Sequence, residues 1–242
     1  LNQFNNGKSK YNTLTMNNKN LILIELNEIN FDFVRKYIDS GEKLHNLNKI
    51  ISDNLIITES EAEYSNLEPW IQWPSVHTGM PFKDHKVFRL GDFINSNEVQ
   101  IFEKIENAGF KVGAISPMNA SNRLSDPKYF IPDPWTDTKP DNSFLSRSLA
   151  SSISQAVNDN SEEKLTFKTL LKLLIAFVML VSPFKYFSMV KLAIISYRKS
   201  WRKALFLDAF LHNVHMTLLK RKSPNFSVLF LNAGAHIQHH YF

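Results

Sequence analysis

The chain contains no cysteine, and this absence removes several kinds of chemistry from consideration. Without cysteine among its 242 residues, the protein has no disulfide framework, no cysteine-ligated metal and no cysteine nucleophile. Such a composition fits a reducing compartment. We therefore expect a cytoplasmic protein, with peripheral contact to a membrane as an open alternative.

Long hydrophobic runs are also missing. Residues 1–19 are polar and rich in asparagine, without the apolar centre of a signal peptide, and they predict a disordered leader. The most apolar stretch, "LLIAFVMLV" at 173–181, is far shorter than the ~20 residues that a transmembrane helix needs. The hydrophobic content of 43% nevertheless allows a sizeable core, as one large domain or a domain with an insertion.

Acidic residues are absent between Lys164 and Leu207, a segment that holds nine of the 28 basic residues. The rest of the chain is consequently net acidic, which argues against general nucleic-acid binding and for one specialised basic region. Lys164, Lys168 and Lys172 recur at i, i+4 spacing opposite apolar residues. This pattern is typical of an interfacial helix on anionic lipid, within 164–203, and equally of a helical cap whose lysines face water.

Apolar runs that alternate with helical patterns predict an α/β fold with a mainly parallel sheet sandwiched by helices. We expect strands at 20–26, 54–60, 110–116 and 226–232, and helices at 29–38 and 97–109. Segments 20–116 and 223–242 would then form the α/β domain. Segment 117–222, a Pro- and Asp-rich loop followed by the basic helical region, would be an insertion or cap.

Polar side chains follow several of the expected strands. In open α/β sheets the functional crevice lies outside the carboxyl ends of the strands, so these side chains are candidates for one site. They are Glu25, Asn27 and Glu28 after the first strand, Gln72, Ser75 and His77 after the second, Ser116 and Asn119 after the third, and Asn232, His236, His239 and His240 after the last.

Three stretches carry a resemblance to a known family. They are "LILIELNEINFDFV" from residue 21, "QWPSVHTGMPFKDH" from residue 72 and "LFLNAGAHIQHHYF" from residue 229. In this order they resemble the opening strand, the nucleophile loop and the late metal-ligand motif of the alkaline phosphatase superfamily, in its type I phosphodiesterase/nucleotide pyrophosphatase branch. The resemblance implies an alkaline-phosphatase-like fold and two divalent metal ions, usually zinc, beside a nucleophilic hydroxyl that attacks a phosphate or sulfate ester.

The matching positions depart from the family pattern. Asn27 stands where the family has a ligand aspartate, Gln72 stands at the nucleophile position, and Ala235 replaces a second aspartate. His239 matches a family ligand directly, while His85 lies one residue beyond the expected histidine. Because downstream family motifs would follow Phe242, we expect the chain to be a fragment of a longer protein.

A local shift of register would supply substitutes for the lost groups. Ser75 becomes the available hydroxyl nucleophile, and the metal ligands are Glu25, Asn27, Glu28, His236 and His239, donors that suit zinc. Structural roles are the alternative: a helix cap for Ser75, polar strand-end residues for the two glutamates, and packing for Trp70 and Trp73, which could also stack on a sugar or base.

Two functions from different classes therefore remain. The first is metal-dependent hydrolysis or transfer of a phosphate or sulfate ester, such as a glycan-linked or membrane-associated phosphodiester. The second is a catalytically inactive relative whose crevice binds a ligand or partner. The substitutions at Asn27, Gln72 and Ala235 favour the second.

Overall fold

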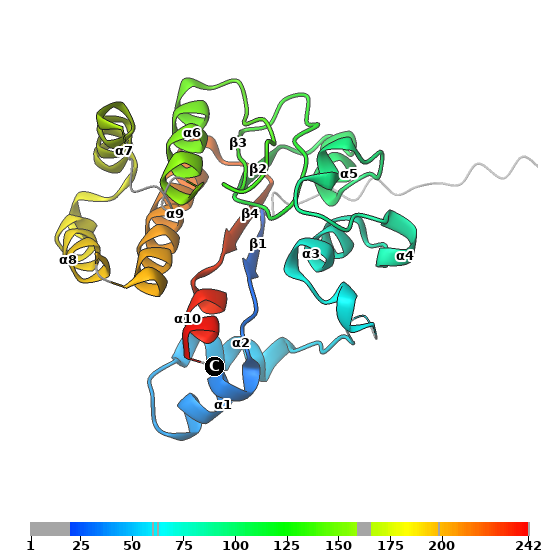
Figure 1. Ribbon diagram of the computed structural model, residues 1–242, viewed down its shortest axis with the longest axis horizontal. Helices are drawn as coiled ribbons and strands as arrows, with labels where there is room; N and C mark the ends of the chain where they lie inside the picture. Colours follow the sequence, from blue (N-terminus) through cyan, green and yellow to red (C-terminus); the bar gives the residue numbers. More distant parts are fainter. Residues whose placement is uncertain (1–19, 60, 62, 159–165, 198, 242) are drawn as a thin grey trace, which may run out of the picture.

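The computed structural model describes residues 20–242 except 60, 62, 159–165, 198 and 242. The expected leader at 1–19 lies outside these described residues, as do Lys164 and Arg198 of the basic segment. The described part is an α/β structure in which helices flank a small sheet (Figure 1), which confirms the predicted fold class at this level.

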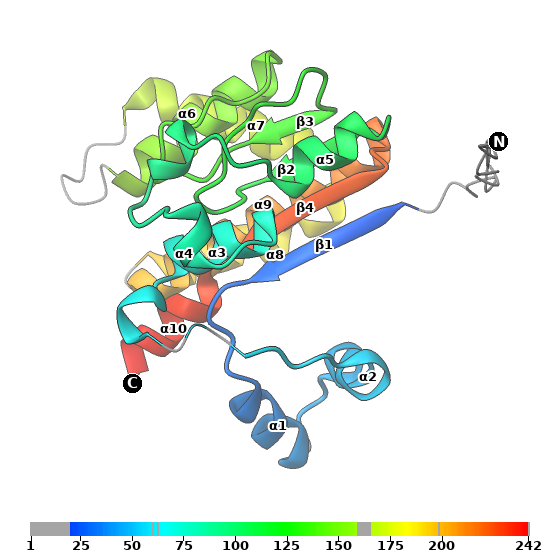
Figure 2. The same cartoon turned by 90° about the vertical axis from the view of Figure 1, so that its right-hand side faces the viewer.

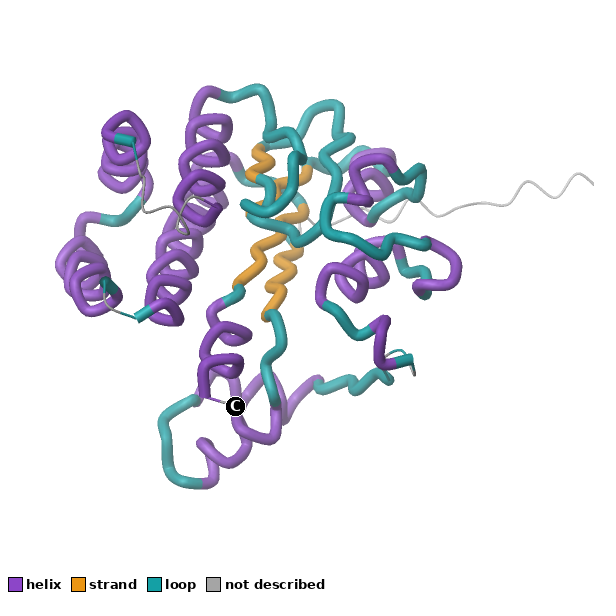
Figure 3. The backbone as a smooth tube through the Cα atoms, in the orientation of Figure 1, coloured by secondary structure: helices purple, strands orange, loops and turns teal. Residues whose placement is uncertain are grey.

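The sheet has four parallel strands, β1 (Leu21–Leu26), β4 (Phe226–Leu231), β2 (Val112–Ile115) and β3 (Tyr129–Ile131), in that spatial order. They run side by side through the centre of the molecule (Figure 3). β2 and β4 are almost entirely buried, as expected for inner strands of a parallel sheet. β1 forms one edge.

Helices cover both faces of the sheet and extend past one end. α6 (Phe144–Asn158), α7 (Phe167–Leu180), α8 (Tyr186–Ser196) and α9 (Ser200–Lys222) lie on one side, and α3 (Pro69–Thr78), α4 (Phe82–His85) and α5 (Ile101–Asn107) lie on the other (Figures 1 and 2). α10 (Ala233–Tyr241) lies beyond the carboxyl ends of β1 and β4, and α1 (Phe31–Asp39) and α2 (His45–Asn54) lie below the edge strand β1 in Figure 2. Two core clusters result, one on each face: Ile115 and Leu229 pack against α6–α9, and Ala114 and Val228 pack against Phe102 of α5.

The strand expected at 54–60 is wrong. Residues 55–59 form no strand, and Ile56 and Ile57 are 85% and 77% exposed. The fourth strand is instead β3, inside the segment expected to be loop, where it pairs with β2. Segment 117–222 thus contributes β3 to the sheet, and α9 packs against β2 and β4.

The expected nucleophile loop is a helix, α3, although Pro74 lies within it. Pro69 occupies the first turn, where its missing N–H costs nothing, and Gly79 ends the helix with φ 75°. Pro74 cannot donate to the carbonyl of Trp70, one turn earlier. The side-chain Nδ2 of Asn119 donates to that carbonyl at 2.7 Å, so a residue following β2 completes the helix.

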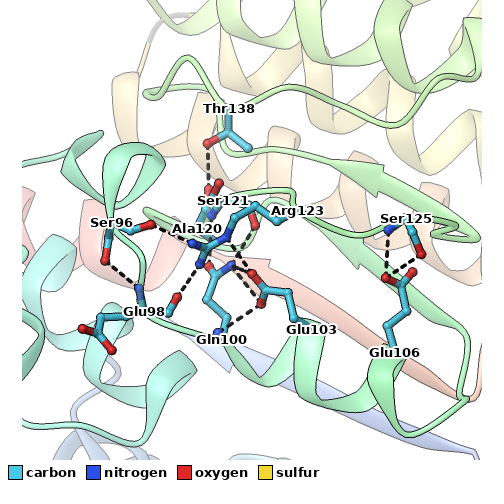
Figure 4. A network of polar contacts seen from close by, with 10 residues as sticks. All are labelled: Ser96, Glu98, Gln100, Glu103, Glu106, Ala120, Ser121, Arg123, Ser125 and Thr138. Atoms are coloured by element: carbon cyan, nitrogen blue, oxygen red, sulfur yellow. Dashed lines mark hydrogen bonds and ion pairs between the residues drawn. The ribbon is translucent and has the colours of Figure 1, made fainter.

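A polar network fixes the segment that follows β2 (Figure 4). Gln100 and Glu103 form a capping box at the start of α5, and the side chain of Gln100 exchanges two hydrogen bonds with the backbone of Ser121, of 2.8 and 3.0 Å. Arg123 Nε donates to Glu103 Oε1 at 2.8 Å, and Thr138 Oγ1 donates to the Ala120 carbonyl at 2.7 Å. The network therefore anchors the segment that also presents Met118 and Asn119.

Among the described residues, no single helix is long and apolar enough to cross a membrane. Only the pair Phe167–Leu180 and Pro183–Ser196 has that length and composition when taken together, and it is bent by 114°.

Candidate functional site

A pocket of about 400 Å³ lies at the carboxyl ends of the strands. Every strand contributes to its wall through the residues that follow it, together with the start of α3. The lining residues are Asn27, Glu28, Glu68, Pro69, Trp70, Leu90, Met118, Trp135, Asn232, Ala235, His236 and His239. We call this the carboxyl-end pocket. Its location agrees with the general rule for open α/β sheets.

Backbone strain is concentrated near this edge. Glu28 (φ 53°), Ser116 (φ 57°) and Asn119 (φ 48°) have left-handed conformations, and all three follow a strand. Such conformations cost free energy in residues other than glycine and cluster at functional sites. The strain therefore supports a functional role for this edge of the sheet.

Asn27 joins three elements at the base of the pocket. Its Nδ2 donates to Asn232 Oδ1 at 2.8 Å, and its Oδ1 accepts a hydrogen bond from Trp73 Nε1 at 2.9 Å. β1, β4 and α3 are thereby tied together through one buried side chain. The side-chain oxygens of Asn27 and Asn232 therefore both accept hydrogen bonds from within the protein. Such an arrangement is typical of a structural link.

Asp208 of α9 orients α10. Its two carboxylate oxygens accept hydrogen bonds from the backbone N–H groups of Asn232 and Ala233, at 3.1 and 2.7 Å. A negative charge at this helix start also suits the helix dipole. Burial raises the pKa of Asp208, and the two backbone hydrogen bonds oppose the rise. Asp208 therefore acts on the site indirectly, because α10 carries His236 and His239.

Glu28 and His239 meet at the mouth of the pocket, with Glu28 Oε2 2.7 Å from His239 Nε2. His236 lies one turn earlier in α10 and lines the same pocket. Desolvation lowers the pKa of His236, and His239 lowers it further, while Glu28 opposes the shift. The sequence prediction that Glu28, His236 and His239 lie together is thus consistent with their shared pocket.

Glu25 lies elsewhere, in the interior. Its Oε1 is 2.8 Å from Nε2 of His77, and both side chains are 1% exposed. The pair connects β1 to α3 beside the ring of Phe102. Glu25 therefore has a buried structural partner and does not line the carboxyl-end pocket.

Ser75 and Gln72 face a second pocket, of about 390 Å³, lined also by Glu59, Glu61 and Gly79. The structure therefore does not bring the expected nucleophile to the carboxyl-end pocket. Gln72 is engaged as well, because its Nε2 donates to the Asn66 carbonyl at 2.5 Å.

The neighbour of Ser75 is His85, whose Nε2 lies 2.9 Å from Ser75 Oγ. The other ring nitrogen, Nδ1, accepts the backbone N–H of Val87 at 3.0 Å. Burial lowers the pKa of His85, against smaller opposing effects of Glu61, Glu98 and Asp84. A neutral ring that accepts at Nδ1 carries its proton on Nε2. His85 therefore donates to Ser75 and, in this tautomer, does not take the hydroxyl proton as a general base.

The donor groups do not fit the expected zinc site. Within the described part of the chain, no group of three or more His, Asp or Glu side chains is placed to hold a metal ion. Glu25 bonds to His77, the Asn27 oxygen accepts from Trp73, and Glu28 pairs with His239. Zinc requires three or four such donors around one point.

Sequence reasoning missed Trp135, Met118 and Glu68 as pocket residues. Trp135 is presented by the loop after β3, which is held by Asp133, a 2% exposed carboxylate. Asp133 accepts hydrogen bonds from the backbone of Asn119, Trp135 and Thr136, at 3.0, 2.9 and 3.0 Å. Burial raises the pKa of Asp133 to about 6, against the effect of these bonds. The motif "PDPW" was the available signal, since an aspartate between prolines forms such turns.

Comparison of the chain with protein-family models, with curated proteins and with solved structures finds no match.

Proposed function

We propose that the chain binds a small neutral or cationic ligand in the carboxyl-end pocket without turning it over. The observation that carries the proposal is the composition of the pocket. Carboxylate, amide and imidazole groups meet two indole rings at the point where all four strands end. Concave sites with an apolar wall and a few polar groups are typical of small-molecule binding.

The charges of the pocket select against an anionic ligand. Glu28 and Glu68 line it, whereas the described lining contains neither lysine nor arginine. A phosphate or sulfate ester needs cationic side chains, a metal ion or free N–H groups at a helix N-terminus to balance its charge. At the start of α10 the N–H groups of Asn232 and Ala233 already donate to Asp208, and at the start of α3 Pro69 has no N–H to offer. Its approach to the two carboxylates would be repelled, while hydroxyl or ammonium groups find hydrogen-bond acceptors there.

The aromatic residues fit the same ligand class. Trp70 and Trp135 belong to the lining and are partly exposed. Indole faces attract cations placed over the ring, and they offer apolar area to the C–H face of a sugar. A sugar or an amino sugar combines such a face with several hydrogen-bond donors, and it is the chemistry that this pocket fits best.

A titration with matched ligands tests the proposal. Glucose, glucosamine and glucose 6-phosphate share one ring and differ in charge, and a panel of other monosaccharides with their amino and phosphate derivatives extends the comparison. We expect tryptophan fluorescence to report binding of neutral or amino sugars, which Glu68→Gln weakens. The matched control Glu42→Gln, an exposed glutamate outside the pocket lining, should leave binding unchanged. Preferential binding of the phosphates would contradict the proposal.

Metal-dependent hydrolysis of a phosphate or sulfate ester, which the family resemblance implies, is the second candidate. Its support is that Glu28, His236 and His239 share one pocket. Zinc titration by calorimetry, with an aryl phosphodiester assay on the same sample, separates the two functions. Stoichiometric zinc binding that His239→Ala abolishes, together with ester hydrolysis, would favour the hydrolase. Absence of both zinc binding and ester hydrolysis would favour ligand binding without turnover.

A further inference from the structure

The outer surface of α7 and α8 is apolar and uncovered. Exposed residues recur at helical spacing along each helix and share one side: Leu170, Leu174 and Val178 in α7, and Phe187, Val190 and Ile194 in α8. Phe184, in the turn Pro183–Lys185 between them, is 96% exposed. We call this surface, together with Phe184, the hairpin face. An apolar patch of this kind marks an interaction surface.

The opposite side of the hairpin is firmly packed. Ala176, Leu180 and Met189 are buried in the core cluster that also contains Phe210 and Val214 of α9. α7 and α8 form the outermost layer, with α9 between them and the sheet (Figure 1). The hairpin face therefore belongs to helices whose inner sides are already buried, and it points away from the protein.

Its charge is of one sign. Lys168, Lys172, Lys185 and Lys191 lie on the hairpin, and no acidic residue occurs between positions 164 and 207. A second copy of the chain would bring these lysines against one another. An anionic surface would instead pair with the exposed lysines next to Phe184 and Phe187, which are Lys185 and Lys191.

Its shape also distinguishes between partners. The segments Phe167–Leu180 and Pro183–Ser196 bend by 114°, so the 96% exposed Phe184 stands at a projecting corner. A partner helix would need a groove to lie in, whereas a projecting aromatic residue with basic neighbours suits the interface of a bilayer.

We propose that the α7–α8 hairpin docks the protein on an anionic phospholipid surface. Phe184 and Phe187 enter the boundary between headgroups and acyl chains, and the exposed Lys185 and Lys191 beside them contact the lipid phosphates. The helices lie along the surface because neither crosses a bilayer alone.

Vesicle co-sedimentation of the full chain tests the proposal. We expect binding to phosphatidylcholine vesicles that contain phosphatidylglycerol, little binding to pure phosphatidylcholine, and release at high salt. Lys185→Gln/Lys191→Gln should reduce partitioning roughly fivefold per lysine. The matched pair Lys43→Gln/Lys49→Gln, two exposed lysines of which one precedes α2 and the other lies in it, should leave partitioning unchanged.

The apolar part of the hairpin face is tested by Phe184→Ser/Phe187→Ser. Each exposed phenylalanine lost should reduce partitioning roughly tenfold, with an unchanged circular dichroism spectrum because neither ring is in the core. Equal binding to neutral and anionic vesicles, or no binding, would overturn the proposal. If the wild type forms an oligomer that does not bind vesicles, and the double variant is a monomer, then a second copy of the chain covers the hairpin face and the proposal is wrong.

Discussion

The buried Glu25–His77 pair gives the sharpest test of which predicted ligands are structural. The two side chains are 1% exposed and joined by a 2.8 Å contact. Among the described residues, the remaining polar atoms of the two side chains, Glu25 Oε2 and His77 Nδ1, have no hydrogen-bond partner. Each residue thus depends on the other for its principal polar contact in the interior.

Removing either partner should be costly, and the two removals should differ. His77→Leu leaves a carboxylate buried without its partner, and we expect a loss of about 3–5 kcal/mol in unfolding free energy. Glu25→Leu leaves an unpaired imidazole, for which about 1–3 kcal/mol is expected. The double variant, with two leucines in contact, should lie within about 1 kcal/mol of the wild type, because a buried polar pair can often be replaced by apolar residues.

Urea denaturation followed by circular dichroism measures all four proteins of this cycle. Additive losses in the double variant would refute the claim that the two residues act as a pair. A zinc ion held by Glu25 would instead make the wild type more stable in zinc and Glu25→Leu insensitive to it, because a bound ligand stabilises the folded state.

Three further substitutions test the surrounding structure. Because burial raises the folded-state pKa of Asp133 to about 6, its contribution to stability is full below its unfolded-state pKa and is lost as pH rises through about 6. Asp133→Asn should remove this pH dependence. The difference in unfolding free energy between the variant and the wild type should therefore change by about 3 kcal/mol between about pH 4 and about pH 7, as measured by urea denaturation at each pH. Ser75→Ala removes the acceptor of His85 and should cost about 1 kcal/mol without changing ligand binding in the carboxyl-end pocket; weaker binding would contradict the separation of the two pockets. Gly113→Ala would place a Cβ 2.4 Å from the ring of Tyr129, so we expect a loss of about 1–3 kcal/mol, visible as a lower Tm; an unchanged Tm would contradict this packing.

The sequence predicted the elements whose signal is local and continuous. β1, β2 and β4 are apolar runs, and α5 lies within the expected helix at 97–109. Strand pairing is not a local property, which explains the two strand errors. The run from 54 to 60 resembles a strand but finds no partner, whereas the three residues of β3 are too few to stand out among prolines yet pair with β2.

The candidate site was predictable only where residues follow strands directly. Asn27, Glu28 and Asn232 line the carboxyl-end pocket because the chain leaves each strand at this edge of the sheet. Ser75 lines the second pocket instead, because the direction of its side chain depends on α3 being a helix. That helix depends on Asn119, which replaces the hydrogen bond that Pro74 cannot make. Such a long-range contact between positions 119 and 70 has no signature in the sequence.

One calorimetric comparison tests the central claim most directly: glucosamine against glucosamine 6-phosphate, each titrated into the full chain with zinc present in excess. Glu28 and Glu68 line a pocket whose described lining holds no lysine or arginine, so the account predicts that the added phosphate weakens or abolishes binding. Tighter binding of the phosphate, dependent on zinc and lost in His239→Ala, would contradict the account and make the carboxyl-end pocket a metal-dependent phosphoester site.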